Sequence, residues 1–466
     1  MQRIVLFLIT VFLFSLTNAD AQRRGDTSYE SLLRQSEQPS AYSDYVVFPQ
    51  SDGTSSLGII FRLEYDFIPF MRKRSNMSAP DDSFEYFSPV RMGVEIFEGE
   101  PRRNRRSNSA TGVPVFRESW SDTVWVETFE DTRSRFNHVQ GYMTTELEAS
   151  NYHYQLQLAR GGSERERPSQ VRPLIVSNAD SSDTTEFILL NDITVGEDSA
   201  EGTLLNYGTN VLYGQNYTLL VRLPNEEIST LSDRFQITIR KGDSDNNSDQ
   251  NEPVFSEMIN EEQIIRISSS EVQQSDDDIV LAMDQAEDGI PYAYITVPNT
   301  EFENTGYVIT LKDTESERDI SEKTVQSRWI DMPISLYSLD VSIDMLRFII
   351  DDSELKEINS GSRSEKERKF REFWAERDPT PDTEFNELMA EYYQRIDYSY
   401  QNFSSFQTPG YDTDRGKAYI LYGPPTNIDR RLLPNQPTRE IWEYPNRELI
   451  FEAVSGLGDF RLISES

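Results

Sequence analysis

The sequence predicts a multi-domain, mainly β protein: two Ig-like antiparallel β-sandwich domains, then a C-terminal α+β domain with about three helices and a small antiparallel sheet. Three observations predict this fold class. A length of 466 residues exceeds what one hydrophobic core ordinarily serves. Apolar residues alternate with a period of two in several runs of residues 45–312, as in half-buried strands. The period changes to 3.6 after Trp329, as in amphipathic helices.

The N-terminus has the parts of a secretory signal peptide. Arg3 is the positive residue, residues 4–16 are apolar, and residues 19–21 (ADA) fit the small-x-small cleavage pattern. The apolar stretch is shorter than the ~20 residues that a membrane span needs. We therefore expect residues 1–21 to be a signal peptide, with an uncleaved anchor as the alternative. No membrane span is expected after cleavage.

Charge and cysteine content narrow the compartment and the partners. The chain has 80 acidic and 45 basic residues, a net charge of −35, and no cysteine. The acidity opposes binding to nucleic acid, because like charges repel. It fits either a very soluble secreted protein or a surface adapted to high salt. Without cysteine there are no disulfides, thiolate metal sites or N-terminal lipid attachment. We expect an exported protein, periplasmic or at the outer cell surface or beyond it, and not a lipoprotein.

Residues 22–44 are polar, with one short helix expected at 29–33, and residues 45–162 are expected to form the first sandwich. Four runs have strand patterns: 59–67, 90–97, 123–128 and 152–158. His153 lies in the last run, and its place in the alternation predicts a surface-facing side chain. The loop 101–109 contains four arginines. A solvated hairpin loop is the favoured interpretation, and an anion or partner site is the alternative.

Residues 163–173 are charged and contain proline, which predicts a linker, and residues 174–312 are expected to form the second sandwich. Its strands are expected at 187–190, 217–223, 235–239, 264–267, 279–283, 292–297 and 307–311. Within it lies the acidic loop 242–252. Its alternating oxygen-bearing residues are typical of a calcium loop: Asp243, Asp245, Asn247 and Asp249. The usual turn glycine and bidentate glutamate are replaced by Ser248 and Val254, so we favour a flexible acidic loop over a calcium site.

Residues 325–466 are expected to form the α+β domain. The first helix has an apolar stripe at Leu339, Ile343, Leu346 and Ile350, with Asp340 as its N-cap. The second is expected at 364–377, opened by a capping box of Ser364 and Glu367. The third follows a cap at Asp382 or Thr383. Strands are expected at 417–422, 439–444, 448–454 and 459–463.

Residues 329–463 carry several separate motifs in order: WIDMPISL (329–336), FREFWAERDPTPDTEFNELMAEYYQRIDY (370–398), GYDTDRGKAYILYGPP (410–425), EIWEY (440–444) and GLGDFRLI (456–463). Together they resemble the GWxTD-domain family of bacterial exported proteins. In the naming motif, Tyr411 stands where the family has tryptophan. The resemblance implies an envelope protein with β-domains ahead of the module, and it implies no reaction.

The motif carries two carboxylates, Asp412 and Asp414, beside Arg415. Such a group could catalyse hydrolysis by acid–base chemistry. A turn held by aspartate side chains is the favoured interpretation, with Arg415 paired to one carboxylate and Gly416 allowing a close approach. The two histidines cannot complete a usual zinc site, and no phosphate-binding or nucleophile motif occurs. No cofactor or metal is therefore expected.

The sequence thus predicts a non-enzymatic binding or structural protein that contacts another envelope protein or a surface polymer. The contact is expected at the motif residues Gly410, Tyr411, Thr413, Asp414, Arg415 and Gly416. Tyr411, Tyr422 and Trp442 are candidate aromatic anchors, with burial favoured for Trp442. A hydrolase that uses Asp412 and Asp414 is the alternative. The oligomeric state stays open.

Overall fold

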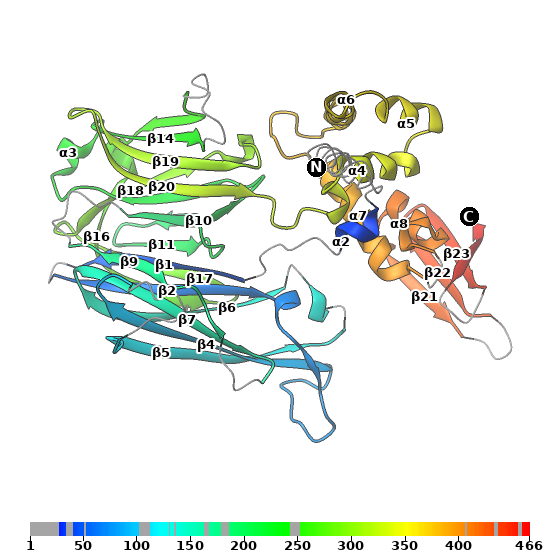
Figure 1. The fold of residues 1–466 in the computed structure, drawn as a ribbon, viewed down its shortest axis with the longest axis horizontal. Helices are drawn as coiled ribbons and strands as arrows, with labels where there is room; N and C mark the ends of the chain where they lie inside the picture. Colours follow the sequence, from blue (N-terminus) through cyan, green and yellow to red (C-terminus); the bar gives the residue numbers. More distant parts are fainter. Residues whose placement is uncertain are drawn as a thin grey trace, which may run out of the picture. The chain divides into compact units, whose positions relative to one another are not determined.

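The computed structural model describes residues 28–33, 41–50, 53–101, 112–129, 131–134, 137–162, 167–178, 186–242, 252–405, 408–432, 437–454 and 459–466. The chain divides into two compact units. We call residues 38–331 with 383–385 the β unit, and residues 1–37, 332–382 and 386–466 the α+β unit. Both are drawn in Figure 1. Among the described residues, no helix is long and apolar enough to cross a membrane.

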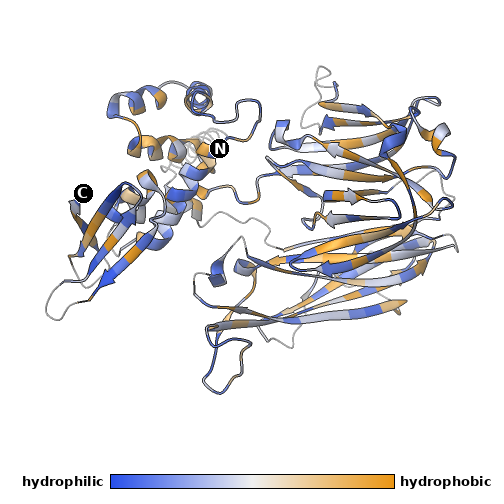
Figure 2. Cartoon of the chain, turned by 180° about the vertical axis from the view of Figure 1, so that it is seen from behind, coloured by the Kyte–Doolittle hydropathy of each residue, from blue (hydrophilic) through white to orange (hydrophobic). Residues whose placement is uncertain are grey.

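The β unit begins with two antiparallel sheets whose inner faces share one hydrophobic cluster. The first contains β1 (Ala41–Pro49), β2 (Thr54–Glu64) and β6 (His138–Glu148). The second contains β3 (Met71–Arg72), β4 (Tyr86–Glu98), β5 (Phe116–Val126), β7 (Ser150–Arg160), β8 (Arg167–Pro168) and β9 (Arg172–Val176). Apolar and hydrophilic residues alternate along these strands (Figure 2). The four predicted strands are confirmed, although Tyr65–Phe67 forms the 3-10 turn η1 rather than the end of β2.

The rest of the β unit contains a closed barrel and a five-stranded sheet. The barrel order is β10 (Phe187–Val195), β11 (Ser199–Leu204), β17 (Asp278–Gln285), β16 (Ile264–Ser275), β18 (Ile290–Val297) and β13 (Tyr217–Arg222). The sheet order is β12 (Asn210–Leu212), β20 (Arg318–Arg328), β19 (Gly306–Asp313), β14 (Phe235–Lys241) and β15 (Phe255–Met258). All seven predicted strands are confirmed, and the closed path of the barrel was not expected. Short helical turns are η2 (Asp131–Arg133), α3 (Ile228–Leu231), η3 (Glu261–Gln263) and η4 (Asn299–Glu301).

One core cluster joins the two β regions. Val46 and Phe48 of β1 and Ile60 of β2 do not belong to the cluster between the first two sheets. They pack instead with barrel residues such as Leu281 and Val272. The strands β1 and β2 therefore bury apolar side chains on both faces. This double burial explains the near-continuous apolar run in β2, which a strand exposed on one face would not have.

The α+β unit contains helices followed by a small sheet. The helices are α2 (Tyr29–Leu33), α4 (Leu339–Met345), α5 (Asp352–Ile358), α6 (Arg363–Ala375), α7 (Glu387–Phe403) and α8 (Asp414–Tyr422), with 3-10 turns η5 (Ile334–Leu336), η6 (Leu346–Phe348) and η7 (Gly410–Asp412). The antiparallel sheet order is β21 (Asn427–Arg431), β22 (Arg439–Tyr444), β23 (Arg447–Ala453) and β24 (Phe460–Glu465). The predicted short helix at 29–33 and the helices-then-sheet order are confirmed.

The prediction of a strand at 417–422 was wrong, because these residues lie in the helix α8. A short apolar run does not distinguish a strand from a buried helix. Thr413 caps the helix, and Ala418 and Ile420 supply its buried face. The first strand of the sheet is instead β21, which was not predicted from the sequence. Its residues NIDRR are mostly exposed, so they lack an alternating apolar pattern.

Three helix starts also differ from prediction. The capping box of α6 is formed by Ser362 and Glu365, not by Ser364 and Glu367. Asn386 rather than Asp382 or Thr383 caps α7, because Thr383–Phe385 belong to the β unit. There the ring of Phe385 contacts those of Tyr213 and Trp329, at centroid distances of 5.7 and 5.2 Å. The N-cap position of α4 is Ser338 rather than Asp340.

Candidate functional site

The two glycines of the GYDTDRG motif allow α7, η7 and α8 to touch through their backbones. A Cβ on Gly410 would lie 1.8 Å from the carbonyl oxygen of Ser399 in α7. A Cβ on Gly416 would lie 1.8 Å from the carbonyl oxygen of Gly410. Any larger residue would separate these segments. The close approach at Gly416 was expected at the start of a strand, but it lies at the start of a helix, and Gly410 makes a second one.

Thr413 joins the turn η7 to the helix α8. Its Oγ1 accepts a hydrogen bond from the backbone N–H of Gly416 at 3.1 Å, which caps the helix. The same hydroxyl donates to the carbonyl oxygen of Gly410 at 2.7 Å. The backbone N–H of Gly410 donates to Ser404 Oγ at 2.8 Å, at the end of α7. The threonine of the motif therefore satisfies one backbone N–H that the start of α8 leaves open and connects it to the carbonyl oxygen of Gly410.

The aromatic position of the motif is internal. Tyr411 is 8% exposed and packs in the main core of the α+β unit. Its ring contacts those of Tyr400 and Tyr29, with centroids 5.8 and 5.6 Å away. Trp442, on β22, is 1% exposed, and Tyr422 is half-buried. The prediction of exposed anchors was therefore wrong for Tyr411, while the favoured burial of Trp442 is confirmed.

The three charged residues of the motif contact three different elements. Asp412 Oδ1 accepts from Arg347 Nη2 of η6 at 3.1 Å. Asp414 Oδ2 accepts from the backbone N–H of Leu462 in β24 at 2.9 Å. Arg415 Nη1 lies 3.1 Å from Glu440 Oε2 of β22. The favoured prediction of a turn held by the aspartate side chains was therefore wrong, because both carboxylates contact distant elements and Thr413 holds the turn. The partner of Arg415 is Glu440 rather than a carboxylate of the motif.

The pair of Arg415 and Glu440 is the most buried of these contacts. Their side chains are 13% and 8% exposed. The guanidinium also lies 4.2 Å from the ring centroid of Phe460 and 5.2 Å from that of Phe403. A guanidinium between a carboxylate and two aromatic faces has most of its charge satisfied inside the protein. These contacts connect α8 to β22 and to the edge strand β24 of the sheet.

Ser399, Arg347 and Glu440 are partners of the motif that were not predicted from the sequence. Ser399 is fully buried, and its Oγ donates to the carbonyl oxygen of Gly416 at 3.3 Å. A buried serine on the apolar side of a helix is a sequence signal for such a contact. Glu440 begins the EIWEY motif, whose period places it on the same face as Trp442, which is a second signal.

His153 is buried, at 3% exposure, so its predicted surface orientation was wrong. Its ring stacks on Phe97 with a centroid distance of 5.2 Å, and Nδ1 lies 2.7 Å from the carbonyl oxygen of Gly99. These contacts accompany the burial of the ring, which alternation alone does not reveal. The remaining predicted sites, namely most of the arginine-rich loop 101–109 and the calcium candidates Asp243, Asp245, Asn247 and Asp249, lie outside the described residues, as does the signal segment 1–21.

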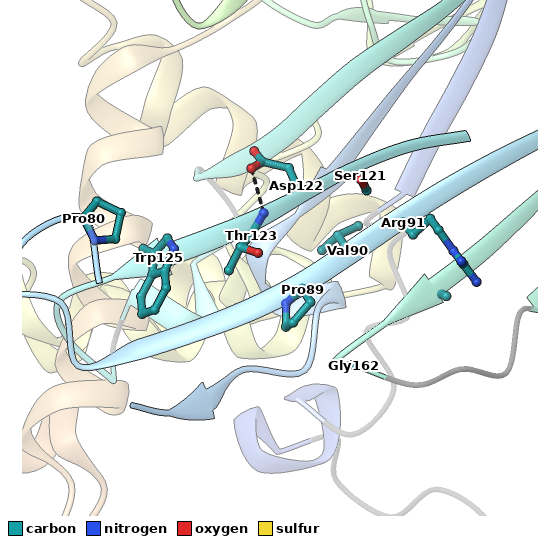
Figure 3. Close-up of a pocket in the computed structure, with 10 residues that line it drawn as sticks. Pro80, Pro89, Val90, Arg91, Ser121, Asp122, Thr123, Trp125 and Gly162 are labelled. Carbon is teal, nitrogen blue, oxygen red and sulfur yellow. Dashed lines mark hydrogen bonds between the residues drawn. The ribbon is translucent and has the colours of Figure 1, made fainter. Parts of the chain in front are cut away.

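A hollow of about 560 Å³ lies on the second sheet of the β unit (Figure 3). It is lined by Pro80, Pro89, Val90, Arg91, Ser121, Asp122, Thr123, Trp125, Ala159 and Gly162. The ring of Trp125 stacks on Phe87, with centroids 5.2 Å apart, and stays partly exposed. Asp122 Oδ1 accepts from the N–H of Thr123 at 2.6 Å. The hollow therefore presents an aromatic ring beside hydroxyl, carboxylate and guanidinium groups.

Within the part of the chain that the structure describes, no group of three or more histidine, aspartate or glutamate residues could hold a metal ion. The described side chains of the motif are also directed to protein partners rather than to a shared open site. The geometry around residues 410–416 is that of a structural joint between helices and sheet.

Comparison with known proteins gives one family. No curated protein matches the chain. Two solved structures are similar over 62% of the chain at 10% identity: the C-terminal domain of the Streptococcus pyogenes antigen I/II-family protein AspA, covered over 100% of its length with a TM-score of 0.15, and purple acid phosphatase PPD1 from yellow lupin (Lupinus luteus) seeds, covered over 40% with a TM-score of 0.14. A family model matches residues 306–453. The C-terminal part of the chain carries a GWxTD domain.

Proposed function

We propose that this protein is an exported envelope protein that binds a surface polymer and catalyses no reaction. The observation that carries the non-enzymatic part is the use of the motif charges. Asp412, Asp414 and Arg415 each contact a different element of the α+β unit. Acid–base hydrolysis needs two carboxylates that face one scissile bond. The contacts of these residues favour the structural role.

The proposed contact surface is the hollow on the β unit rather than the motif. Sites for small polar ligands combine an aromatic wall with a few placed hydrogen-bonding groups. Trp125 supplies such a wall, and Ser121, Thr123 and Arg91 supply the polar groups. A sugar ring has an apolar face and several hydroxyls, so a polysaccharide matches this combination. The net charge of −35 favours a neutral or basic polymer over an acidic one.

Binding to polysaccharide prepared from the producing cell envelope tests the proposal. The Trp125→Ala chain is expected to bind about tenfold more weakly than wild type, because a central aromatic anchor contributes much of an interface energy. Phe129→Ala is the matched control, since Phe129 is 54% exposed and absent from the hollow lining. Equal binding by both variants would exclude the hollow as the contact. Capture of a protein in place of polymer would overturn the polymer assignment.

The same polymer preparation tests the hydrolase alternative. No new reducing ends are expected on incubation with the wild-type chain. Release of reducing ends that the Asp414→Asn chain does not produce would contradict the non-enzymatic proposal. Export is tested separately by mass spectrometry of the secreted chain, for which an N-terminus at Gln22 is expected.

A further inference from the structure

The short helix α2 supplies part of the core of the α+β unit. It has five residues, and Tyr29 and Leu32 are 2% and 5% exposed. Both belong to the cluster that contains Tyr411 and Ile396. These partners follow α2 by more than 360 residues in the chain. The GWxTD domain of this protein is therefore completed by a segment from the other end of the sequence.

The side chain of Tyr29 occupies a site formed by Asp397, Tyr400 and Tyr411, with the N–H groups of Ile334 and Ser335 beside it. We call these residues the Tyr29 site. The hydroxyl of Tyr29 donates to Asp397 Oδ1 at 2.9 Å. Its ring lies 4.8 Å from that of Tyr400 and 5.6 Å from that of Tyr411, centroid to centroid.

Asp397 is held in place for this contact by the turn η5. Its Oδ2 accepts from the N–H of Ile334 at 2.6 Å, and its Oδ1 accepts from the N–H of Ser335 at 3.3 Å. The carboxylate is thus positioned by groups other than Tyr29. The aromatic walls are positioned too, because Tyr411 is fixed by the motif turn and also contacts Phe348, with ring centroids 6.4 Å apart. The site is formed largely by residues outside α2.

We propose that the Tyr29 site is a binding site for a tyrosine-bearing helical peptide, and that residues 28–33 of a second copy of this chain can occupy it in place of the chain's own segment. Among the α2 side chains that the structure describes, those of Tyr29 and Leu32 are buried and provide the contacts with the core. A helix of five residues has little stability by itself, so the site must provide the energy that forms it. When two copies exchange an identical segment, each contact within one chain is replaced by the same contact between the two chains.

The chain's own segment has a strong advantage at ordinary concentrations. That segment belongs to the same chain as the site, so its binding is intramolecular and is favoured over binding of a second copy. Occupation in trans is therefore expected once the internal segment is weakened. This proposal is independent of the polymer-binding proposal, since none of the residues of the hollow on the β unit lines the Tyr29 site.

The test uses the full chain with Tyr29→Ala and a fluorescent peptide of residues 25–36 as the probe. Fluorescence anisotropy is expected to show saturable binding to the Tyr29→Ala chain. No binding is expected to wild type at the same concentration, because its own α2 fills the site. A peptide with Tyr29→Phe is expected to bind about tenfold more weakly, since it lacks the hydrogen bond to the Asp397 carboxylate.

The control chain is Ser31→Ala, which alters α2 outside the Tyr29 site and is expected to exclude the peptide as wild type does. Failure of the folded Tyr29→Ala chain to bind peptide would overturn the proposal, as would equal binding of a Tyr29→Ala peptide. If the Tyr29→Ala chain does not fold, a protease site placed within residues 34–40 of the otherwise wild-type chain replaces it. After cleavage, exchange of the bound segment for labelled peptide is expected, and a lasting failure to exchange would also overturn the proposal.

Discussion

The Cα of Gly416 lies against the carbonyl oxygen of Gly410, so closely that an added Cβ would be 1.8 Å from that oxygen. Gly416 is in the first turn of α8, and Gly410 begins η7. The two glycines of the motif therefore contact each other rather than a ligand. This contact explains why position 416 requires glycine, since the backbone of α8 meets the backbone of η7 there.

Gly416→Ala is expected to destabilise the α+β unit by about 3 kcal/mol or more, because the methyl group forces the backbones apart. In an exposed helix the same change would stabilise by up to about 1 kcal/mol, so the sign of the effect tests the packing. Chemical denaturation followed by tryptophan fluorescence measures it. Gly93→Ala in β4 is the control, since its Cβ would have ordinary contacts at 3.6 Å. Stabilisation by Gly416→Ala would contradict the close approach.

Glu440→Gln is expected to cost about 3 kcal/mol or more, because it leaves the guanidinium of Arg415 buried without a counter-charge. Glu443→Gln, an exposed change on the same strand, is expected to cost less than about 0.5 kcal/mol. A double-mutant cycle with Arg415→Met and Glu440→Gln measures the coupling. Strictly additive losses would show that the two side chains do not interact.

Asp414→Ala is expected to speed hydrogen exchange at the amide of Leu462 by about tenfold or more, since the change removes a hydrogen bond to a charged acceptor. Amide exchange measured by NMR or mass spectrometry resolves this local effect. Asp412→Ala changes the neighbouring carboxylate, whose partner is Arg347, and is expected to leave the Leu462 amide unchanged. Equal acceleration by both variants would indicate general loosening of the sheet instead.

Burial raises the pKa of Glu186 from its ordinary 4.5 to about 7, although the nearby Arg222 opposes the shift. Between these pH values the folded state holds a proton that the unfolded state has lost. The contribution of Glu186 to stability is therefore complete below pH 4.5 and is lost as the pH rises to about 7. The melting temperature of the Glu186→Gln chain is therefore expected to fall less than that of wild type between pH 4.5 and about 7.

Thermal melts of wild type and Glu186→Gln from pH 4.5 to 8 measure this difference for the β unit. Glu201→Gln, an exposed change on β11, is the control and is expected to follow wild type at every pH. Parallel curves for wild type and Glu186→Gln would contradict the raised pKa.

Local pattern was enough to predict most strands and the helical region. The alternation in 152–158 and the apolar stripe from Leu339 to Ile350 mark elements whose apolar side chains face one core. The motifs were enough to indicate the GWxTD domain, which the family match confirms. Pattern failed at 417–422, where a short apolar run fits a helix and a strand equally, and packing on α7 decides for the helix.

The sequence by itself determined the mainly β class, the helices-then-sheet order of the C-terminal part and the family of that part, because these depend on periodicity and motif spacing within short windows. Only the tertiary structure decided that Tyr411 is internal, that Arg415 pairs with Glu440, and that Tyr29 completes a core more than 300 residues away in the chain. The physical reason is that burial and pairing depend on which distant segments meet. Neither the periodicity nor the motif spacing of the sequence shows which distant segments come into contact.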